Sequence, residues 1–147
     1  FLGDIFQSLN DFHQIIFLNG HHGNVESLNK LRNNMNREYV RPGAPLVQCY
    51  SYWHFMKHEF DHAGFVETSI MLAISDKVKM EKAEKGLITK GLSDEEIQRI
   101  NKLSTQPGGF PQVTKNGVWG DPTDATKKDG EEFLAEIVRN LAKECQS

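Results

Sequence analysis

The chain has 147 residues, enough for one domain with its own hydrophobic core and too few for two domains to be expected. Hydrophobic residues make up 38% of the sequence and charged residues 25%, which is ordinary for a soluble globular protein. The net charge of −3 at pH 7 argues against a nucleic-acid partner held by bulk electrostatics, and no apolar run approaches the roughly 20 residues that cross a bilayer.

The beginning of the sequence already follows a helical rhythm of apolar residues. Residues 1–12 are predicted to form an amphipathic helix whose inner face carries Leu2, Ile5, Phe6 and Leu9. First residues of natural chains are usually mobile and polar. A start inside a core-facing helix therefore indicates that this sequence continues a longer chain.

The next segments predict a strand, a helix and a second strand. A continuous apolar run predicts a strand over residues 14–18, as in a parallel sheet with both faces covered. Asn24 could cap the following helix, which ends before the Pro- and Gly-rich residues 41–45 and buries Val25, Leu28, Leu31 and Met35. Residues 46–52 predict the second strand. A parallel pair with a right-handed crossover is favoured, so the fold class is α/β.

The second half of the chain predicts helices and one loop. One helix runs to residue 74 or 75, and a weakly helical charged stretch covers residues 76–91. Ser93 begins a capping signature for the next helix. Residues 106–111 predict a loop, and the C-terminal helix tolerates Gly130 near its start. The expected buried positions of the three helices are Val66, Ile70 and Ala73, then Ile97, Ile100 and Leu103, then Phe133, Leu134, Ile137, Val138 and Leu141.

Two isolated cysteines, Cys49 and Cys145, lack the spacing of a metal site and do not make a disulfide framework. No signal-peptide pattern opens the sequence. We therefore expect a cytoplasmic protein with neither a nucleic-acid nor a membrane partner.

The turn at residues 19–24 is the first place where chemistry is expected. It follows the first strand, and loops at the carboxyl ends of parallel strands form ligand sites. Between its two glycines lie His21 and His22, whose imidazoles are good ligands for zinc, manganese or iron. His21 and Glu67 could meet at one cation, and His62 could move a proton between water and a leaving nitrogen.

The same residues could instead only satisfy backbone groups at turns, and their spacing leaves both readings open. Trp53 could form the wall of a pocket or simply belong to the core. The other three histidines, His13, His54 and His58, are assigned no catalytic role.

Three segments resemble motifs of the creatininase (creatinine amidohydrolase) family, in the order found there. They are FLNGHHGN at residues 17–24, HAGFVETS at residues 62–69 and GVWGDPTDAT at residues 117–126. The corresponding family motifs are NGHGGN, HAGExETS and GVxGDPxxAT. The resemblance implies a three-layer α/β sandwich with a mostly parallel sheet flanked by helices. It also implies a metal-dependent amidohydrolase that cleaves a C–N bond of an amide or cyclic amide through metal-activated water.

The resemblance also implies roles for individual residues. His21 matches a metal ligand, and Glu67 is the obvious second ligand, because Gly23 stands where creatininase has a ligand glutamate. His62 matches the proton-shuttling catalytic histidine. Trp53 falls near a position that lines the substrate pocket. His22, the neighbour of His21 in the turn, is assigned to substrate binding. The divalent metal is expected to be zinc, manganese or iron.

The sequence departs from the family pattern at two places, and the second of them changes the expected assembly. Phe65 stands where many relatives carry a glutamate. The upstream motif E-x-H-G-x-H-x-P-x-x-x-D, which supplies further metal ligands, is absent from this sequence. The chain is therefore predicted to be the C-terminal portion of a creatininase-like domain, residues 1–147. A second chain, from the same precursor or a paired subunit, would complete the site in a homo- or hetero-oligomer such as the hexamers of the family.

Three alternatives remain at this stage. Family members also act on formamide groups, peptide bonds and keto-sugar rings, so the substrate is open. The chain could be a non-catalytic or site-completing subunit of a hetero-oligomeric enzyme, although the presence of His21 and Glu67 argues against a non-catalytic one. A sugar-phosphate or nucleotide-binding module is disfavoured, because the glycine turn lacks a phosphate-binding lysine.

Overall fold

A computed structural model describes residues 5, 8, 9, 11–38 and 43–146 of the chain. These residues form two compact units, Phe1–Phe55 and Met56–Ser147, which are described separately below. Most of the helix predicted over residues 1–12 lies outside the described residues, as does part of the connection at residues 41–45. Helices and a parallel sheet together confirm the predicted α/β class.

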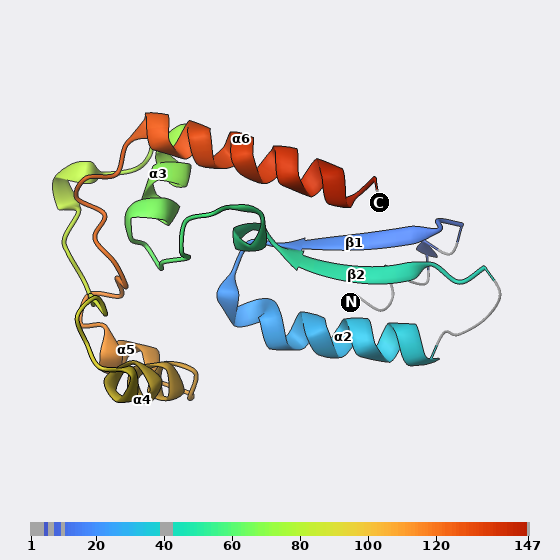
Figure 1. The fold of residues 1–147 in the computed structure, drawn as a ribbon, viewed down its shortest axis with the longest axis horizontal. Helices are drawn as coiled ribbons and strands as arrows, with labels where there is room; N and C mark the ends of the chain where they lie inside the picture. The colour runs from blue at the N-terminus through green and yellow to red at the C-terminus, as the bar shows by residue number, and fades with distance from the viewer. Residues whose placement is uncertain (1–4, 6–7, 10, 39–42, 147) are drawn as a thin grey trace. The chain divides into compact units, whose positions relative to one another are not determined.

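The first unit is a strand–helix–strand crossover, as the sequence predicts. Strand β1 (Gln14–Asn19) pairs in parallel with β2 (Leu46–Ser51), so that Gln14 lies opposite Leu46 and Asn19 opposite Ser51. Helix α2 (Val25–Glu38) connects the strands and lies along one face of the sheet (Figure 1). Between β1 and α2, a short 3₁₀ turn η1 (His22–Asn24) contains Asn24, the predicted cap.

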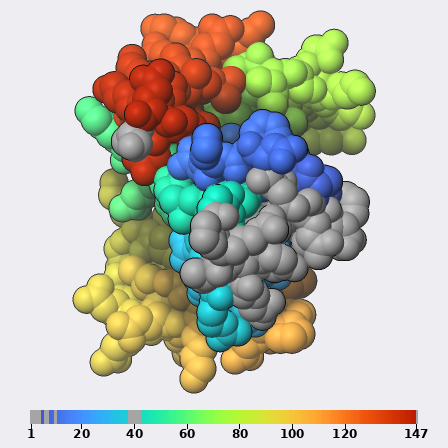
Figure 2. Space-filling model, turned by 90° about the vertical axis from the view of Figure 1, so that its right-hand side faces the viewer, coloured from blue at the N-terminus to red at the C-terminus, as the bar shows by residue number. Residues whose placement is uncertain are grey.

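The core of this unit lies between the sheet and α2 (Figure 1). In the space-filling view of Figure 2, the blue residues of β1 lie beside the teal residues of β2. Ile15 and Val47 are its buried centre, with 8% and 1% of their surface exposed. On the opposite face of the strands, Leu18 and Leu46 are 53% and 52% exposed. The apolar run of β1 predicted burial on both faces, but side chains alternate along a strand and α2 covers only one of its faces.

One residue of α2 closes the outer edge of β2. The side-chain amide of Asn36 donates to the carbonyl oxygen of Val47 and accepts from the Val47 N–H, both at 3.0 Å. A neighbouring strand would use these same two backbone groups. Asn36 therefore takes the place of a further strand at this edge, a device that protects sheet edges from unwanted pairing.

The second unit is built on the packing of two helices, α3 (Phe65–Ile74) and α6 (Lys127–Glu144), which lie against each other in Figure 1. They meet at Ser69, which is 0% exposed, and at Gly130. A Cβ atom placed on Gly130 would lie 1.8 Å from the carbonyl oxygen of Ser69. The prediction that the C-terminal helix merely tolerates Gly130 is wrong. Glycine is needed at this position, because α3 approaches so closely that no side chain fits.

The remaining helices are α4 (Asp94–Ser104) and the short α5 (Phe110–Val113), accompanied by the 3₁₀ turn η3 (Met80–Lys82). The capping box of Ser93 and Glu96 is present as predicted, and its hydrogen bonds lower the pKa of the Glu96 carboxyl. Helix α5 begins inside the predicted loop, because proline fits the first turn of a helix.

The prediction that Val138 is buried is wrong, since 62% of its surface is exposed. It lies beside the buried stripe of α6 that Phe133 and Ile137 form. None of the helices in the described parts of the chain combines the length and hydrophobicity that crossing a membrane requires.

Candidate active site

The turn after β1 is held by a buried asparagine. Asn19 is almost fully buried, and its side-chain oxygen accepts from the backbone N–H of His21 at 3.1 Å and from the Asn24 amide at 3.4 Å. Its side-chain nitrogen donates to the Ser51 hydroxyl at 3.1 Å. Asn19 thus fixes the turn to the end of β2, as expected for a loop built on the carboxyl edge of a parallel pair.

The imidazole of His21 lies over Gly23. A Cβ atom on Gly23 would come within 2.8 Å of His21 Nε2, so a larger residue would displace the ring. His21 itself is exposed, which leaves its ring accessible to a ligand. Gly23 therefore leaves room for the observed position of the His21 ring.

An aromatic cluster lies around Trp53, in the 3₁₀ turn η2 (Tyr52–Phe55) that follows β2. The ring of His22 stacks on that of Trp53, with centroids 6.0 Å apart and an angle of 29° between planes. Tyr52 and His54 meet the same indole edge-on at 5.1 and 5.9 Å. The structure thus brings together His22 and Trp53, the two residues predicted to line a substrate pocket.

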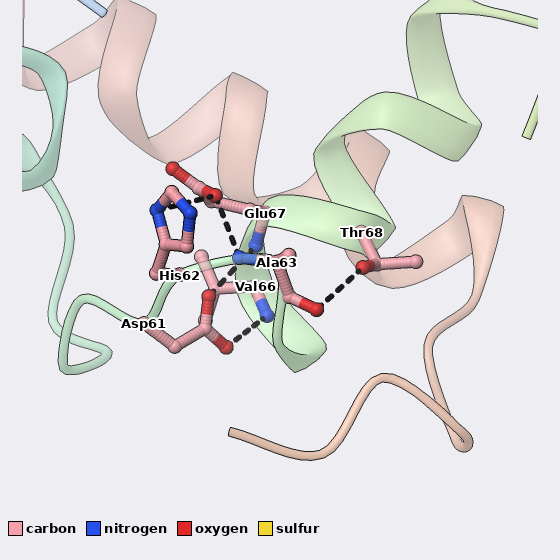
Figure 3. Close-up of polar contacts among 6 residues, drawn as sticks. All are labelled: Asp61, His62, Ala63, Val66, Glu67 and Thr68. Atoms are coloured by element: carbon pink, nitrogen blue, oxygen red, sulfur yellow. Dashed lines mark hydrogen bonds and ion pairs between the residues drawn. The ribbon is translucent and has the colours of Figure 1, made fainter. Parts of the chain in front are cut away.

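His62 and Glu67 are neighbours at the start of α3 (Figure 3). Oxygen Oε2 of Glu67 lies 3.9 Å from His62 Nδ1 and accepts a hydrogen bond from the Ala63 N–H at 2.8 Å. This 3.9 Å separation is too long for a hydrogen bond, but it places the carboxylate oxygen beside one ring nitrogen of His62. The His62 ring also packs edge-on against Phe110, with centroids 4.8 Å apart.

The third sequence motif holds the backbone of His62. The N–H of His62 donates to the Trp119 carbonyl at 3.0 Å, and the Trp119 N–H donates back to the His62 carbonyl at 2.8 Å. Gly120 follows with a φ of 134° and lies so close to Gly64 that a Cβ atom would approach the Gly64 Cα within 2.9 Å. The segment at residues 117–126 therefore supports the site through its backbone.

Asp61 is a site residue that the sequence analysis missed. Its carboxylate accepts from the backbone N–H groups of Val66 at 2.8 Å and Glu67 at 3.1 Å, the first turn of α3 (Figure 3). Acidic side chains are favoured at helix N-termini, because the first N–H groups lack partners within the helix. The signal was present in the sequence as an acid just before the predicted helix.

A pocket with a volume of about 290 Å³ opens beside Glu67. Its lining surface is mostly apolar, and the residues that form it include Ala63, Glu67, Met71, Lys77 and Val78. Glu67 thus borders both His62 and the pocket.

The described residues do not hold a complete metal site by themselves. No three His, Cys, Asp or Glu side chains in the described ranges gather as a set of ligands. His21 belongs to the first unit and Glu67 to the second, so their pairing at one metal stays a prediction. The Cys49 thiol donates to the Leu28 carbonyl, and burial raises its pKa, so it is not a thiolate nucleophile at neutral pH.

Sequence comparison matches nearly the whole chain to one protein family. The family model described as "Creatininase: Creatinine amidohydrolase" matches residues 1–145. Proteins named "Mycofactocin precursor peptide peptidase" are similar to this chain. The one from Mycobacterium ulcerans is 34% identical over 127 residues, and the one from Mycolicibacterium smegmatis is 35% identical over 131 residues. These matches cover 85% and 88% of this chain but 45% and 47% of the relatives.

Structure comparison gives the same family. A structure described as a creatinine amidohydrolase from Bacteroides fragilis has a TM-score of 0.75 and 27% identity, over 97% of this chain and 57% of that one. A mutant creatininase of the Zn–Zn type has a TM-score of 0.70 and 23% identity, over 95% of this chain and 58% of that one. A further structure, titled "Creatininase Mn", has a TM-score of 0.64 at 23% identity and covers 59% of that chain. This chain thus spans a little under half of the curated relatives and more than half of these structures.

Proposed function

The chain belongs to the creatininase family of hydrolases, and we propose that it provides the proton-transferring part of a metal-dependent site that hydrolyses an amide C–N bond. The observation that carries this proposal is the pairing of His62 with Glu67 inside the second family motif. A peptide bond is the favoured substrate, because the relatives named as peptide peptidases share 34% and 35% identity with this chain. A cyclic amide is the second candidate, since the similar solved structures are creatininases.

His21 is the described residue that best suits a metal ion in the first unit. Its imidazole is exposed and Gly23 makes room for it, while neutral imidazole is a common ligand of zinc and manganese. Glu67 is proposed as a ligand from the second unit, although its oxygen Oε2 already accepts from Ala63. A divalent cation bound there supplies polarisation of the amide carbonyl and activation of water. We propose that the remaining ligands come from a second chain.

The chain's own contribution is the handling of a proton at His62. Because Nδ1 faces the Glu67 carboxylate, the opposite ring nitrogen Nε2 is the atom that can reach a substrate. His62 Nε2 accepts a proton from the water that attacks the amide carbonyl, the Glu67 carboxylate stabilises the imidazolium that forms, and Nε2 then gives this proton to the departing nitrogen. Phe110 packs against the ring and limits its movement, and the stacked rings of His22 and Trp53 are proposed to contact the substrate.

Removal of the metal is expected to abolish hydrolysis and its return to restore it, because the carbonyl is not polarised without it. The measurement is amine release from short peptides and from creatinine, before and after chelation and reloading with zinc or manganese. His21→Ala is expected to lose bound metal in elemental analysis, while His22→Ala, its neighbour, keeps it. Full metal occupancy in His21→Ala, or hydrolysis by the metal-free protein, contradicts this proposal.

A second polypeptide is proposed to complete the sheet and the metal site. The chain covers 45% and 47% of two curated relatives, and one face of its two-stranded sheet leaves Leu18 and Leu46 half exposed. Two strands alone are marginally stable. Asn36 occupies the outer edge of β2 at Val47, so the edge that remains for another strand is that of β1.

Co-purification tests the partner. Intact mass measurement and N-terminal sequencing of the purified protein are expected to find a second polypeptide carrying the upstream metal motif. Leu18→Lys is expected to reduce its recovery strongly, since a charge would be buried at the contact. Val138→Lys serves as the control, because it changes an exposed apolar residue on α6 whose exposed fraction is 62%, against 53% for Leu18. A sample that contains this chain alone and is still active rules the partner out, whereas a complex that stays active with His62 substituted makes this chain a site-completing, non-catalytic subunit.

A further inference from the structure

Two carboxylates, those of Asp61 and Glu67, bind backbone N–H groups of the loop before α3 and of the first turn of α3. Asp61 reaches forward to the N–H groups of Val66 and Glu67, while Glu67 reaches back to the N–H of Ala63. His62 lies between the two, and its ring faces the returning carboxylate (Figure 3). We propose that Asp61 is the positioning residue of this site, which sets the distance between Glu67 and His62. This inference rests on the proposed role of His62 in proton transfer.

The backbone conformation of Ala63 in this loop is stabilised by side chains of α3. Ala63 has a φ of 50°, the left-handed region that residues with a side chain rarely adopt. Such a conformation persists only where neighbouring contacts impose it. Here the Glu67 carboxylate binds the Ala63 N–H, and the Thr68 hydroxyl donates to the Ala63 carbonyl at 3.4 Å. Both contacts come from α3, whose first turn is bound by Asp61.

Two glycines, Gly64 and Gly120, leave the space that the Asp61 side chain occupies. A Cβ atom on Gly64 would lie 2.5 Å from Asp61 Oδ2, and one on Gly120 would lie 3.3 Å from Asp61 Cβ. Two glycines from separate motifs thus make room for this side chain. If Asp61 released α3, Glu67 would move with the first turn, and its carboxylate would no longer face His62 in the same way.

Asp61→Asn tests the proposal with almost no change in size. The amide keeps one acceptor and turns an NH₂ group toward an N–H of α3, so one of the two hydrogen bonds is lost. A shift of about 1 Å in a catalytic group can cost about a hundredfold in rate. We therefore expect kcat of the metal-loaded complex to fall on the order of tenfold to a hundredfold, with KM unchanged, because the Asp61 carboxylate is bound to backbone N–H groups of α3.

Ser93→Ala is the matched control, since it removes the N-terminal cap of α4 in the same unit without touching the site. Both substitutions are expected to lower the midpoint of thermal unfolding, but only Asp61→Asn is expected to lower kcat and to move the imidazole ¹⁵N signals of His62. If Asp61→Asn does not fold, Asp61→Ser, which also keeps one acceptor, provides the same comparison. Unchanged kcat and His62 signals in the Asp61 variant, or an equal fall of kcat in Ser93→Ala, overturn the inference. If His62→Ala is itself fully active, the proposed function fails instead.

Discussion

His62→Ala is expected to lower kcat by about 10²–10⁴-fold, the range typical of losing a positioned general acid–base. Several contacts place this imidazole. Trp119 binds its backbone on both sides, Phe110 packs against the ring, and Glu67 faces Nδ1. Alanine removes the group that carries the proton while leaving the backbone pairing with Trp119 intact. Bound metal is therefore expected to stay, because the predicted ligands are other residues.

The measurement combines kcat on a short peptide with elemental analysis of the same sample. His13→Ala is the control, since His13 is exposed and its structural contact is a backbone hydrogen bond from Leu46 to its carbonyl. Loss of metal together with activity in His62→Ala would make His62 a ligand. Unchanged turnover would instead remove the histidine from the mechanism.

Gly130→Ala is expected to destabilise the chain by about 1–3 kcal/mol or more, the cost of forcing atoms into a filled core. The new methyl group would lie 1.8 Å from the Ser69 carbonyl oxygen and 2.4 Å from the carbonyl carbon, so α3 and α6 must move apart. This contact is central to the second unit, where Ser69 is fully buried and its hydroxyl accepts from the Thr126 N–H at 3.2 Å. The measurement is thermal or denaturant unfolding followed by circular dichroism.

Helix propensity alone predicts that Gly130→Ala raises the stability of the chain instead of lowering it. Alanine in the interior of a helix is favoured over glycine by about 1 kcal/mol, so an uncrowded position would become more stable. Gly20→Ala is a control at a glycine outside the helices, because apart from its chain neighbours no atom lies within 4 Å of its added Cβ. If Gly130→Ala unfolds at the same or a higher temperature than the parent chain, the close packing of α3 on α6 is wrong.

The sequence by itself determined the local elements and the family. A continuous apolar run located β1 and the alternation of residues located β2, each to within one residue of the observed strand. The Ser93 capping box was predictable because its two hydrogen bonds join residues only three positions apart. The three motifs identified the creatininase family, and they pointed to His62 and Glu67 before any geometry was known.

What the tertiary structure decided depends on segments that are distant in the chain. The crowding of Gly130 arises from the carbonyl of Ser69, and the packing of His62 arises from Phe110 and Trp119. No local pattern encodes such approaches, since they follow from how α3, α5 and the third motif pack together. Asp61 shows the same limit at short range. Its acid was visible beside a predicted helix start, but only the folded loop shows that it binds the first turn of α3 and so places Glu67 against His62.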